Sequence, residues 1–165
     1  MIKKILLMAA VVLPLFASAQ TLKVGLVDTN EIIGKMPETT AAQNTLNEAQ
    51  KKYQAELQRI DEEFQRQYEE LQAMSDDELP AIKERKVRQL QETQQKGEAF
   101  QQQVIQDLQK QQEELMAPVI QKVRNAIESV GKENGFNLIQ EMAGQLYYAA
   151  PVEDITPLVK SKLGL

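Results

Sequence analysis

Two long stretches of helical periodicity dominate this sequence. Between Thr39 and Met74 there is neither glycine nor proline, and most residues are strong helix formers. Apolar side chains recur there at steps of seven, four and three residues, which gathers them on one helical face. They are Leu46, Tyr53, Leu57, Ile60, Phe64, Tyr68 and Leu71. A second stripe predicts a helix over residues 77–133, and it contains Leu90, Gly97, Phe100, Val104, Leu108, Leu115, Val119, Val123, Ile127 and Val130.

The residues between the two stripes predict a tight reversal. Ser75 and Glu78 have the spacing of a capping box, and Pro80 suits the first turn of a new helix. The two helices should therefore form an antiparallel hairpin. At about 1.5 Å per residue the first is roughly 50 Å long and the second roughly 80 Å, so both must project from any core that this chain can build. Pro118 is expected to bend the second helix, because proline removes one backbone hydrogen bond.

The two ends of the chain carry strand patterns and short helical segments. Gly135 is expected to end the long helix, and Asp154 to cap the last one. The expected strands are Leu22–Asp28, Phe136–Glu141 and Gln145–Ala149, and the expected short helices are Asn30–Met36 and Ile155–Lys162. The sequence thus predicts an α+β fold. Residues 20–38 and 134–165 form a small body, and residues 39–133 form a long helical hairpin arm.

The first 19 residues have the order of a secretory signal peptide. Two lysines precede the apolar run Ile5–Phe16, and Ala17-Ser18-Ala19 has the small-x-small form of a cleavage site. The run is shorter than the roughly 20 residues that span a bilayer, which argues against an uncleaved anchor. We expect cleavage after Ala19 and an exported chain. Because the sequence has no cysteine, its stability must come from packing or oligomerisation.

Charge and residue content argue against several functional classes. Without Lys3 and Lys4, the chain keeps 17 basic and 24 acidic residues, a net charge of −7 that does not favour nucleic acid or an anionic membrane. There is no histidine or cysteine, and Gly25 and Gly34 stand alone rather than in a phosphate-binding loop. Neighbouring carboxylates on an exposed helix are usually a solvated face, and Asp76-Asp77-Glu78 lacks the spacing of a calcium loop. We expect no catalysis, no cofactor and no metal.

The end segments resemble the Skp/OmpH family. The resemblance lies in Lys23–Ile33 (KVGLVDTNEII), Asn134–Ile139 (NGFNLI), Leu146–Tyr148 (LYY) and Asp154–Val159 (DITPLV), taken in that order. It implies a homotrimer shaped like a jellyfish, with strands joined in a central trimerisation body and three helical arms around a cavity. It also implies a periplasmic chaperone that holds unfolded outer-membrane proteins there without nucleotide hydrolysis.

The acidic charge departs from the best-known members, which are markedly basic. Their charge is linked to contact with membranes and lipopolysaccharide, and we do not extend that property to a chain of net charge −7. The candidate remnant is the basic cluster near the arm tip, although flanking glutamates favour ordinary helix solvation. The cluster consists of Lys83, Arg85, Lys86 and Arg88.

Two sets of residues are candidates for binding. Apolar side chains away from the seam between the two helices are expected to contact clients: Tyr68, Met74, Val87, Ile105 and Met116. The seam itself is expected to contain Leu57, Ile60, Phe64, Leu90, Phe100, Val104 and Leu108. In the body, subunit association is expected to bury Val24, Leu26, Leu138, Ile139, Tyr147 and Tyr148.

The same helical pattern also fits a structural protein. An envelope coiled-coil spacer or adaptor with one fixed protein partner would carry a continuous apolar seam and charged helices as well. The end segments that resemble Skp favour the chaperone, and binding to a single defined partner would favour the adaptor.

Overall fold

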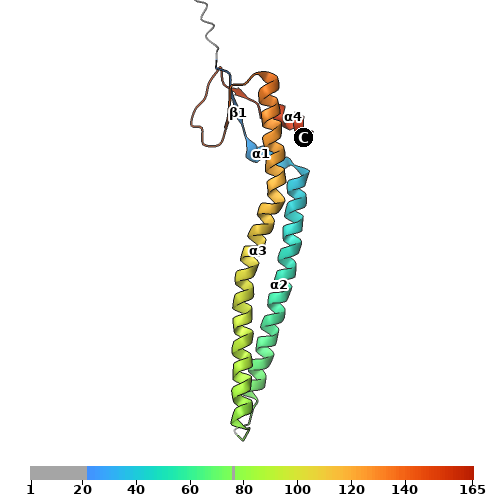
Figure 1. The fold of residues 1–165 in the computed structure, drawn as a ribbon, viewed down its shortest axis with the longest axis vertical. Helices are drawn as coiled ribbons and strands as arrows, with labels where there is room; N and C mark the ends of the chain where they lie inside the picture. The colour runs from blue at the N-terminus through green and yellow to red at the C-terminus, as the bar shows by residue number, and fades with distance from the viewer. Residues whose placement is uncertain (1–21, 76) are drawn as a thin grey trace, which may run out of the picture.

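The arm and body expected from the sequence are both present, and the fold is α+β (Figure 1). The computed structural model describes residues 22–75 and 77–165, so the expected signal peptide lies outside the described residues. Within them, no helix is both long and apolar enough to cross a membrane. The elements in chain order are β1 (Val24–Val27), α1 (Thr29–Lys35), α2 (Pro37–Gln72), α3 (Pro80–Asn134), β2 (Leu138–Glu141), β3 (Glu153–Asp154) and α4 (Thr156–Leu163).

Helices α2 and α3 form the arm, and proline begins each of them. Pro37 and Pro80 occupy the first turn, where a missing N–H costs nothing and the fixed φ suits the helix. The expectation that the second helix begins at Asp77 is wrong, because the helix begins at Pro80 after the extended residue Leu79. The capping box does not form either. The Ser75 hydroxyl instead accepts a hydrogen bond from the Asp77 amide at 3.3 Å, within the turn that joins the helices.

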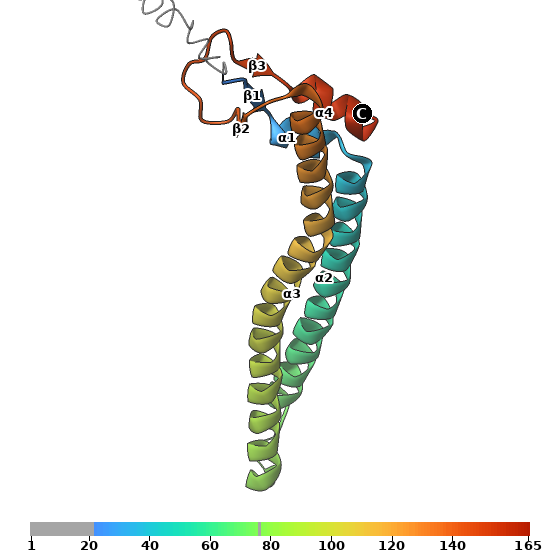
Figure 2. The same cartoon turned by 45° about the horizontal axis from the view of Figure 1, so that its top comes forward.

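Helix α3 curves along its length and ends at a glycine. Figure 2 shows the curve between its lower half and the part that joins the body. Pro118 lies inside the helix, and a proline there removes a backbone hydrogen bond and favours such a bend. At the end of α3, Gly135 has φ of 66°, the left-handed conformation that glycine adopts without a Cβ clash.

The body contains a three-stranded parallel sheet in the order β2-β1-β3. The strand expected at Gln145–Ala149 is absent, and the third strand is Glu153–Asp154. The topology explains the difference. Because β2 and β3 are both parallel to β1, the chain must return between them to the start of the sheet, and residues 142–152 make that return.

The start of α4 also differs from the expectation. Asp154 lies in β3, and the residue that precedes the helix is Ile155. The Asp154 carboxylate still accepts a hydrogen bond from the Thr156 amide at 2.9 Å. It therefore satisfies one backbone donor at the start of the helix, from one position earlier than expected.

A small core lies where the sheet, the short helices and the last part of α3 meet. Its buried side chains are Val27, Ile32, Met36, Val119, Val123, Ala126, Val130, Ile155 and Val159. On the sheet, Gly25 lies so close to the packed side chains that an added Cβ would stand 3.1 Å from Ile155 and 3.2 Å from the Phe136 ring. None of these buried core side chains belongs to α2, or to α3 before Val119, so most of the arm extends beyond the core.

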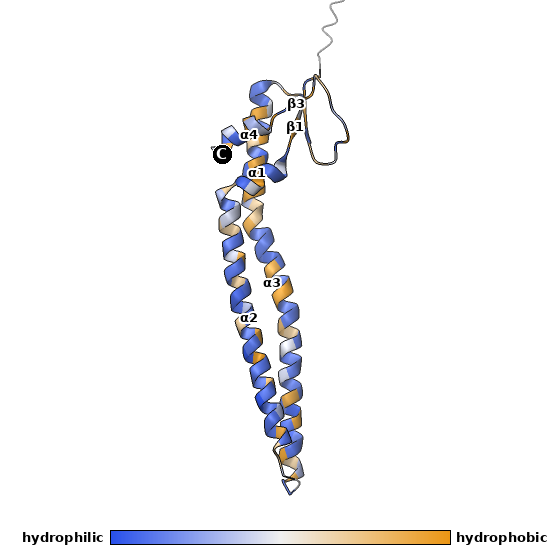
Figure 3. Ribbon diagram, turned by 180° about the vertical axis from the view of Figure 1, so that it is seen from behind, coloured by the Kyte–Doolittle hydropathy of each residue, from blue (hydrophilic) through white to orange (hydrophobic). Residues whose placement is uncertain are grey.

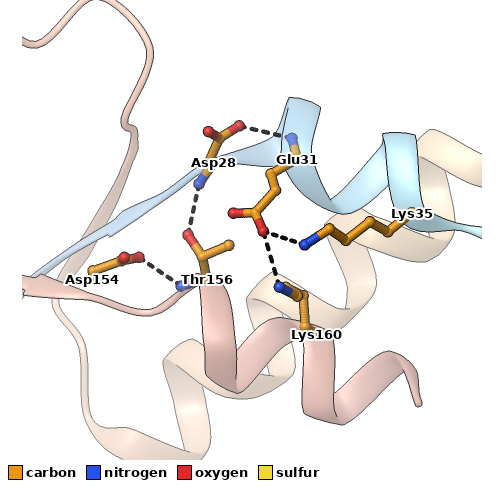
Figure 4. Close-up of polar contacts among 6 residues, drawn as sticks. All are labelled: Asp28, Glu31, Lys35, Asp154, Thr156 and Lys160. Atoms are coloured by element: carbon orange, nitrogen blue, oxygen red, sulfur yellow. Dashed lines mark hydrogen bonds and ion pairs between the residues drawn. The ribbon is translucent and has the colours of Figure 1, made fainter. Parts of the chain in front are cut away.

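Polar contacts join α1 to α4 on the surface of the body (Figure 4). The Asp28 carboxylate accepts from the Glu31 amide at 2.8 Å, and the Asp28 amide donates to the Thr156 hydroxyl at 2.9 Å. The Glu31 carboxylate accepts from Lys35 at 2.7 Å and from Lys160 at 3.0 Å. These two ammonium groups, Lys35 first, lower the pKa of Glu31 from 4.5 to about 2.

Candidate functional site

The arm is held together by a seam in which apolar and polar contacts alternate. The side chains expected there are all buried or half-buried: Leu57, Ile60, Phe64, Leu90, Phe100, Val104 and Leu108. Across the seam, the rings of Tyr53 and Phe100 meet edge to face, with centroids 6.1 Å apart. The Tyr53 hydroxyl also accepts a hydrogen bond from the side-chain amide of Gln111 at 3.2 Å. These contacts hold the two helices together, so the exposed apolar side chains elsewhere on the arm are not required for the seam.

Three of the five expected client-contacting residues are exposed along the arm. Tyr68 is 43% exposed, Val87 38% and Ile105 62%. Tyr68 lies parallel to Phe64, with ring centroids 6.5 Å apart, so its ring is held in position on the arm surface. These side chains are available to a partner, and their role as contacts stays a prediction.

The two methionines of that set lie in different surroundings. Met74 is half-buried in the turn between the helices. Met116 is also half-buried, and it packs against the core of the body. Met116 therefore has a packing role that the sequence pattern did not distinguish from an exposed one.

Two exposed side chains of the arm were missed in the sequence. Leu79 is 66% exposed just before α3, and Ile120 is 45% exposed four residues after Met116. Met116, Ala117 and Ile120 line a shallow hollow of about 570 Å³ on α3. The i, i+4 spacing from Met116 was the signal that could have identified Ile120. Figure 3 shows apolar positions spread along both arm helices among polar ones, rather than gathered in one patch.

The basic cluster near the arm tip is partly paired with the arm's own carboxylates. Lys86 contacts Glu70 of α2 at 2.5 Å, and Arg88 contacts Glu84 at 3.2 Å. The Lys86 ammonium lowers the pKa of the Glu70 carboxyl group. These contacts fit ordinary solvation of a helix surface better than a dedicated anion site.

The six expected subunit-contact residues fall into two groups. Leu26 is only 2% exposed within a single chain, and Val24 and Ile139 are half-buried. Ile139 packs against α3 so closely that a Cβ on Gly131 would stand 2.9 Å from its terminal methyl group. The other three side chains face solvent, with Leu138 43%, Tyr147 84% and Tyr148 47% exposed. Leu146, beside the tyrosines, is fully exposed as well.

The sequence has no histidine and no cysteine. In residues 22–75 and 77–165, no group of three or more carboxylates is placed to hold a metal ion. What the described surface offers is apolar side chains separated by charges and amides.

Comparison with known proteins identifies a family and solved structures with a similar fold. The family model described as "Outer membrane protein (OmpH-like)" matches residues 23–163. The chain is also similar to a crystal structure of an OmpH-like outer membrane chaperone from Caulobacter crescentus CB15, with a TM-score of 0.73. The identity is 15%, over 85% of this chain and 82% of that one, so this likeness concerns the fold. No curated protein matches the chain.

Proposed function

This chain belongs to the OmpH-like outer membrane protein family, and from that premise we propose that it is a periplasmic holding chaperone. It binds unfolded outer-membrane proteins and prevents their aggregation without nucleotide. Residues 1–19 act as the signal peptide for export, with cleavage after Ala19.

The observation that carries the proposal is the arm, which extends far beyond the core and presents isolated apolar side chains. Helices α2 and α3 contain 36 and 55 residues, and the core of the body uses only the last part of α3. Tyr68, Val87 and Ile105 are exposed along them, separated by charges and amides. Each can gain about 25 cal/mol for every Å² that a client covers. Many such weak contacts hold diverse unfolded chains, and the charges keep the arm soluble.

We infer a homotrimer from the family and from the surface of the body. Each outer strand of the sheet, β2 and β3, pairs with β1 on one side only within the described chain, so both edges offer backbone groups for pairing. Leu138 is exposed in β2, and Leu146, Tyr147 and Tyr148 are exposed in the return between β2 and β3. Association of three copies would bury them. Three arms around one cavity would then share a client and increase its avidity.

The proposal excludes three other roles. It includes no catalytic step and no nucleic-acid partner, since the exported chain is acidic and lacks histidine and cysteine. It includes no lipopolysaccharide or membrane contact, because two of the four basic residues near the tip already pair with Glu70 and Glu84.

Light scattering tests the proposal. An outer-membrane barrel protein unfolded in urea is diluted into buffer, with and without the purified mature chain. We expect the chain to suppress aggregation at about three copies per client, in the absence of nucleotide. Unchanged aggregation with a folded, oligomeric chain would refute the chaperone and favour an envelope spacer or adaptor that binds one fixed partner.

A further inference from the structure

A groove of about 330 Å³ opens in the seam of the arm, where α2 and α3 do not fill the space between them. We call it the seam groove. Ile60 and Thr93 are buried in its wall, and Phe64 and Gly97 are half-buried. Two exposed carboxylates, Asp61 on α2 and Glu98 on α3, also line the groove. The groove therefore combines an apolar wall with negative charge from both helices.

Gly97 contributes no side chain to the groove that it lines. Glycine is among the least favourable residues in the interior of a helix, and Gly97 lies well inside the 55 residues of α3. Close packing does not require it, because an added Cβ would stand 3.4 Å from the Ile60 Cγ2 atom, an ordinary contact distance. The absent side chain thus leaves room beside Ile60 without bringing the helices unusually close.

The charges on the groove select its occupant. Neither Asp61 nor Glu98 takes part in an ion pair within residues 22–75 and 77–165. The nearby cation Arg59 is held at 2.7 Å by Glu56. A cation supplied by another molecule would therefore meet two carboxylates, one from each helix. The small volume, at the low end of the range for ligand pockets, suits one large apolar side chain rather than a folded domain.

We propose that the seam groove holds a segment of unfolded polypeptide in which a large apolar side chain stands next to a lysine or arginine. The apolar side chain packs against Ile60 and Phe64, and the cation binds Asp61 and Glu98. This inference rests on the proposed holding function and names a class of segment that the arm prefers. It makes the acidic charge of this chain a determinant of which segments are held.

Peptide binding to the full mature chain tests the inference. Three fluorescent 12-residue disordered peptides are compared by anisotropy: one with phenylalanine between two arginines, one with phenylalanine between two glutamates, and one with serine between two arginines. We expect the first to bind about three- to tenfold more tightly than either of the others. This is the range for exposed ion pairs in the comparison with glutamate, and for partial burial of one aromatic side chain in the comparison with serine. The preference over the glutamate peptide should shrink as salt is added. Equal affinity for the arginine and glutamate peptides would overturn the inference.

Matched variants locate the site. Gly97→Leu fills the groove and should weaken the phenylalanine–arginine peptide about tenfold, whereas Gly97→Ala should bind it as the native chain does. Asp61→Asn with Glu98→Gln should abolish the difference between the arginine and glutamate peptides. These two exposed substitutions and Gly97→Ala keep the test valid even if Gly97→Leu disturbs the seam. Native binding and native peptide preference in both Gly97→Leu and the double variant would place the peptide elsewhere and overturn the inference.

Three further outcomes separate this inference from the holding function. If the native chain prevents aggregation but binds the arginine and glutamate peptides equally, the seam groove is refuted and the chaperone stands. If Gly97→Leu changes the oligomeric state and no peptide binds the native chain, the groove is covered by a second copy of the chain and the inference fails. Failure of the native chain to prevent aggregation refutes the chaperone itself, whatever the peptides do.

Discussion

The hydroxyl of Thr93 donates a hydrogen bond of 2.9 Å to the side-chain carbonyl of Gln67, and both side chains are buried between the two arm helices. The Gln67 amide in turn donates to Glu63 at 3.2 Å, so this polar layer is satisfied. Buried polar layers in helical seams fix the register of the helices, because any sliding would leave their groups without partners. The pair thus sets how α2 and α3 align near the distal end of the arm.

Replacing Thr93 with valine should destabilise the arm. Valine keeps the shape of threonine but leaves the carbonyl of Gln67 buried without a donor, at a cost of about 1–3 kcal/mol. Urea unfolding followed by circular dichroism measures this as a lower midpoint. The double variant Thr93→Val with Gln67→Leu removes both polar partners and should recover much of the loss. A single variant as stable as the native chain would contradict a structural role for the pair.

The stability of the body should depend on pH through Glu31. Lys35 and Lys160 lower the pKa of this carboxyl group from 4.5 to about 2 in the folded chain, so the folded state favours the charged form. The stabilisation is complete above about pH 4.5 and is lost as the pH falls towards 2. Thermal unfolding between these pH values should show a shallower loss of stability in Glu31→Gln than in the native chain.

An exposed carboxylate elsewhere provides the control for that experiment. Glu92 is exposed on α3 and makes no ion pair within the described residues, so Glu92→Gln should keep the native pH profile. Native and Glu31→Gln profiles that run parallel from pH 4.5 to 2 would show that the contacts of Glu31 with Lys35 and Lys160 contribute no stability.

Sequence periodicity was sufficient for the arm because the apolar stripes extend over many turns. Thr93 and Gln67 continue those stripes, three residues after Leu90 and Phe64, but polar residue types concealed their burial. The start of α3 was placed too early because the spacing of Ser75 and Glu78 suggested a cap, whereas Pro80 determines the first turn. Near a turn, the conformational limits of proline determine where a helix begins more strongly than a short capping pattern does.

The body was harder to predict because its strands are short and its topology is nonlocal. The pattern of Gln145–Ala149 suits a strand, yet in a single chain this segment is part of the return from β2 to β3. Burial of Leu26 and Ile139 was attributed to other subunits, although neighbouring elements of the same chain already cover much of both. Alternation identifies which residues are buried, but not which chain buries them.

Exposed body residues are therefore the better probes of the proposed trimer. Leu138 and Tyr148 are 43% and 47% exposed in the single chain, so Leu138→Glu with Tyr148→Glu should leave its own core intact. We expect sedimentation to show a smaller species than the native oligomer, with helix content retained. Leu26→Glu instead buries a charge within one chain and should lower the helix content of the body. A double variant of native size would refute an interface at these two residues.

The last prediction concerns the arm surface. Changing Tyr68, Val87 and Ile105 together to serine removes three exposed apolar side chains while leaving the seam residues in place. If a client covers part of each, the loss is about 0.5–1 kcal/mol per site at roughly 25 cal/mol per Å², and affinity should fall about 10- to 150-fold in total. Labelled unfolded outer-membrane protein, titrated with the native chain and the variant, measures this. Circular dichroism should show equal helix content in both.

A polar control distinguishes client contact from a general effect of serine in a helix. Gln65, Gln89 and Gln102 are exposed on the same two helices. Changing all three to serine lowers helix propensity at least as much as the apolar triple variant does, without removing apolar surface. This control should bind the client as the native chain does. If both triple variants bind equally well, the three apolar residues are not contacts, and the client must be held by the seam groove, by the hollow beside Ile120, or by the body.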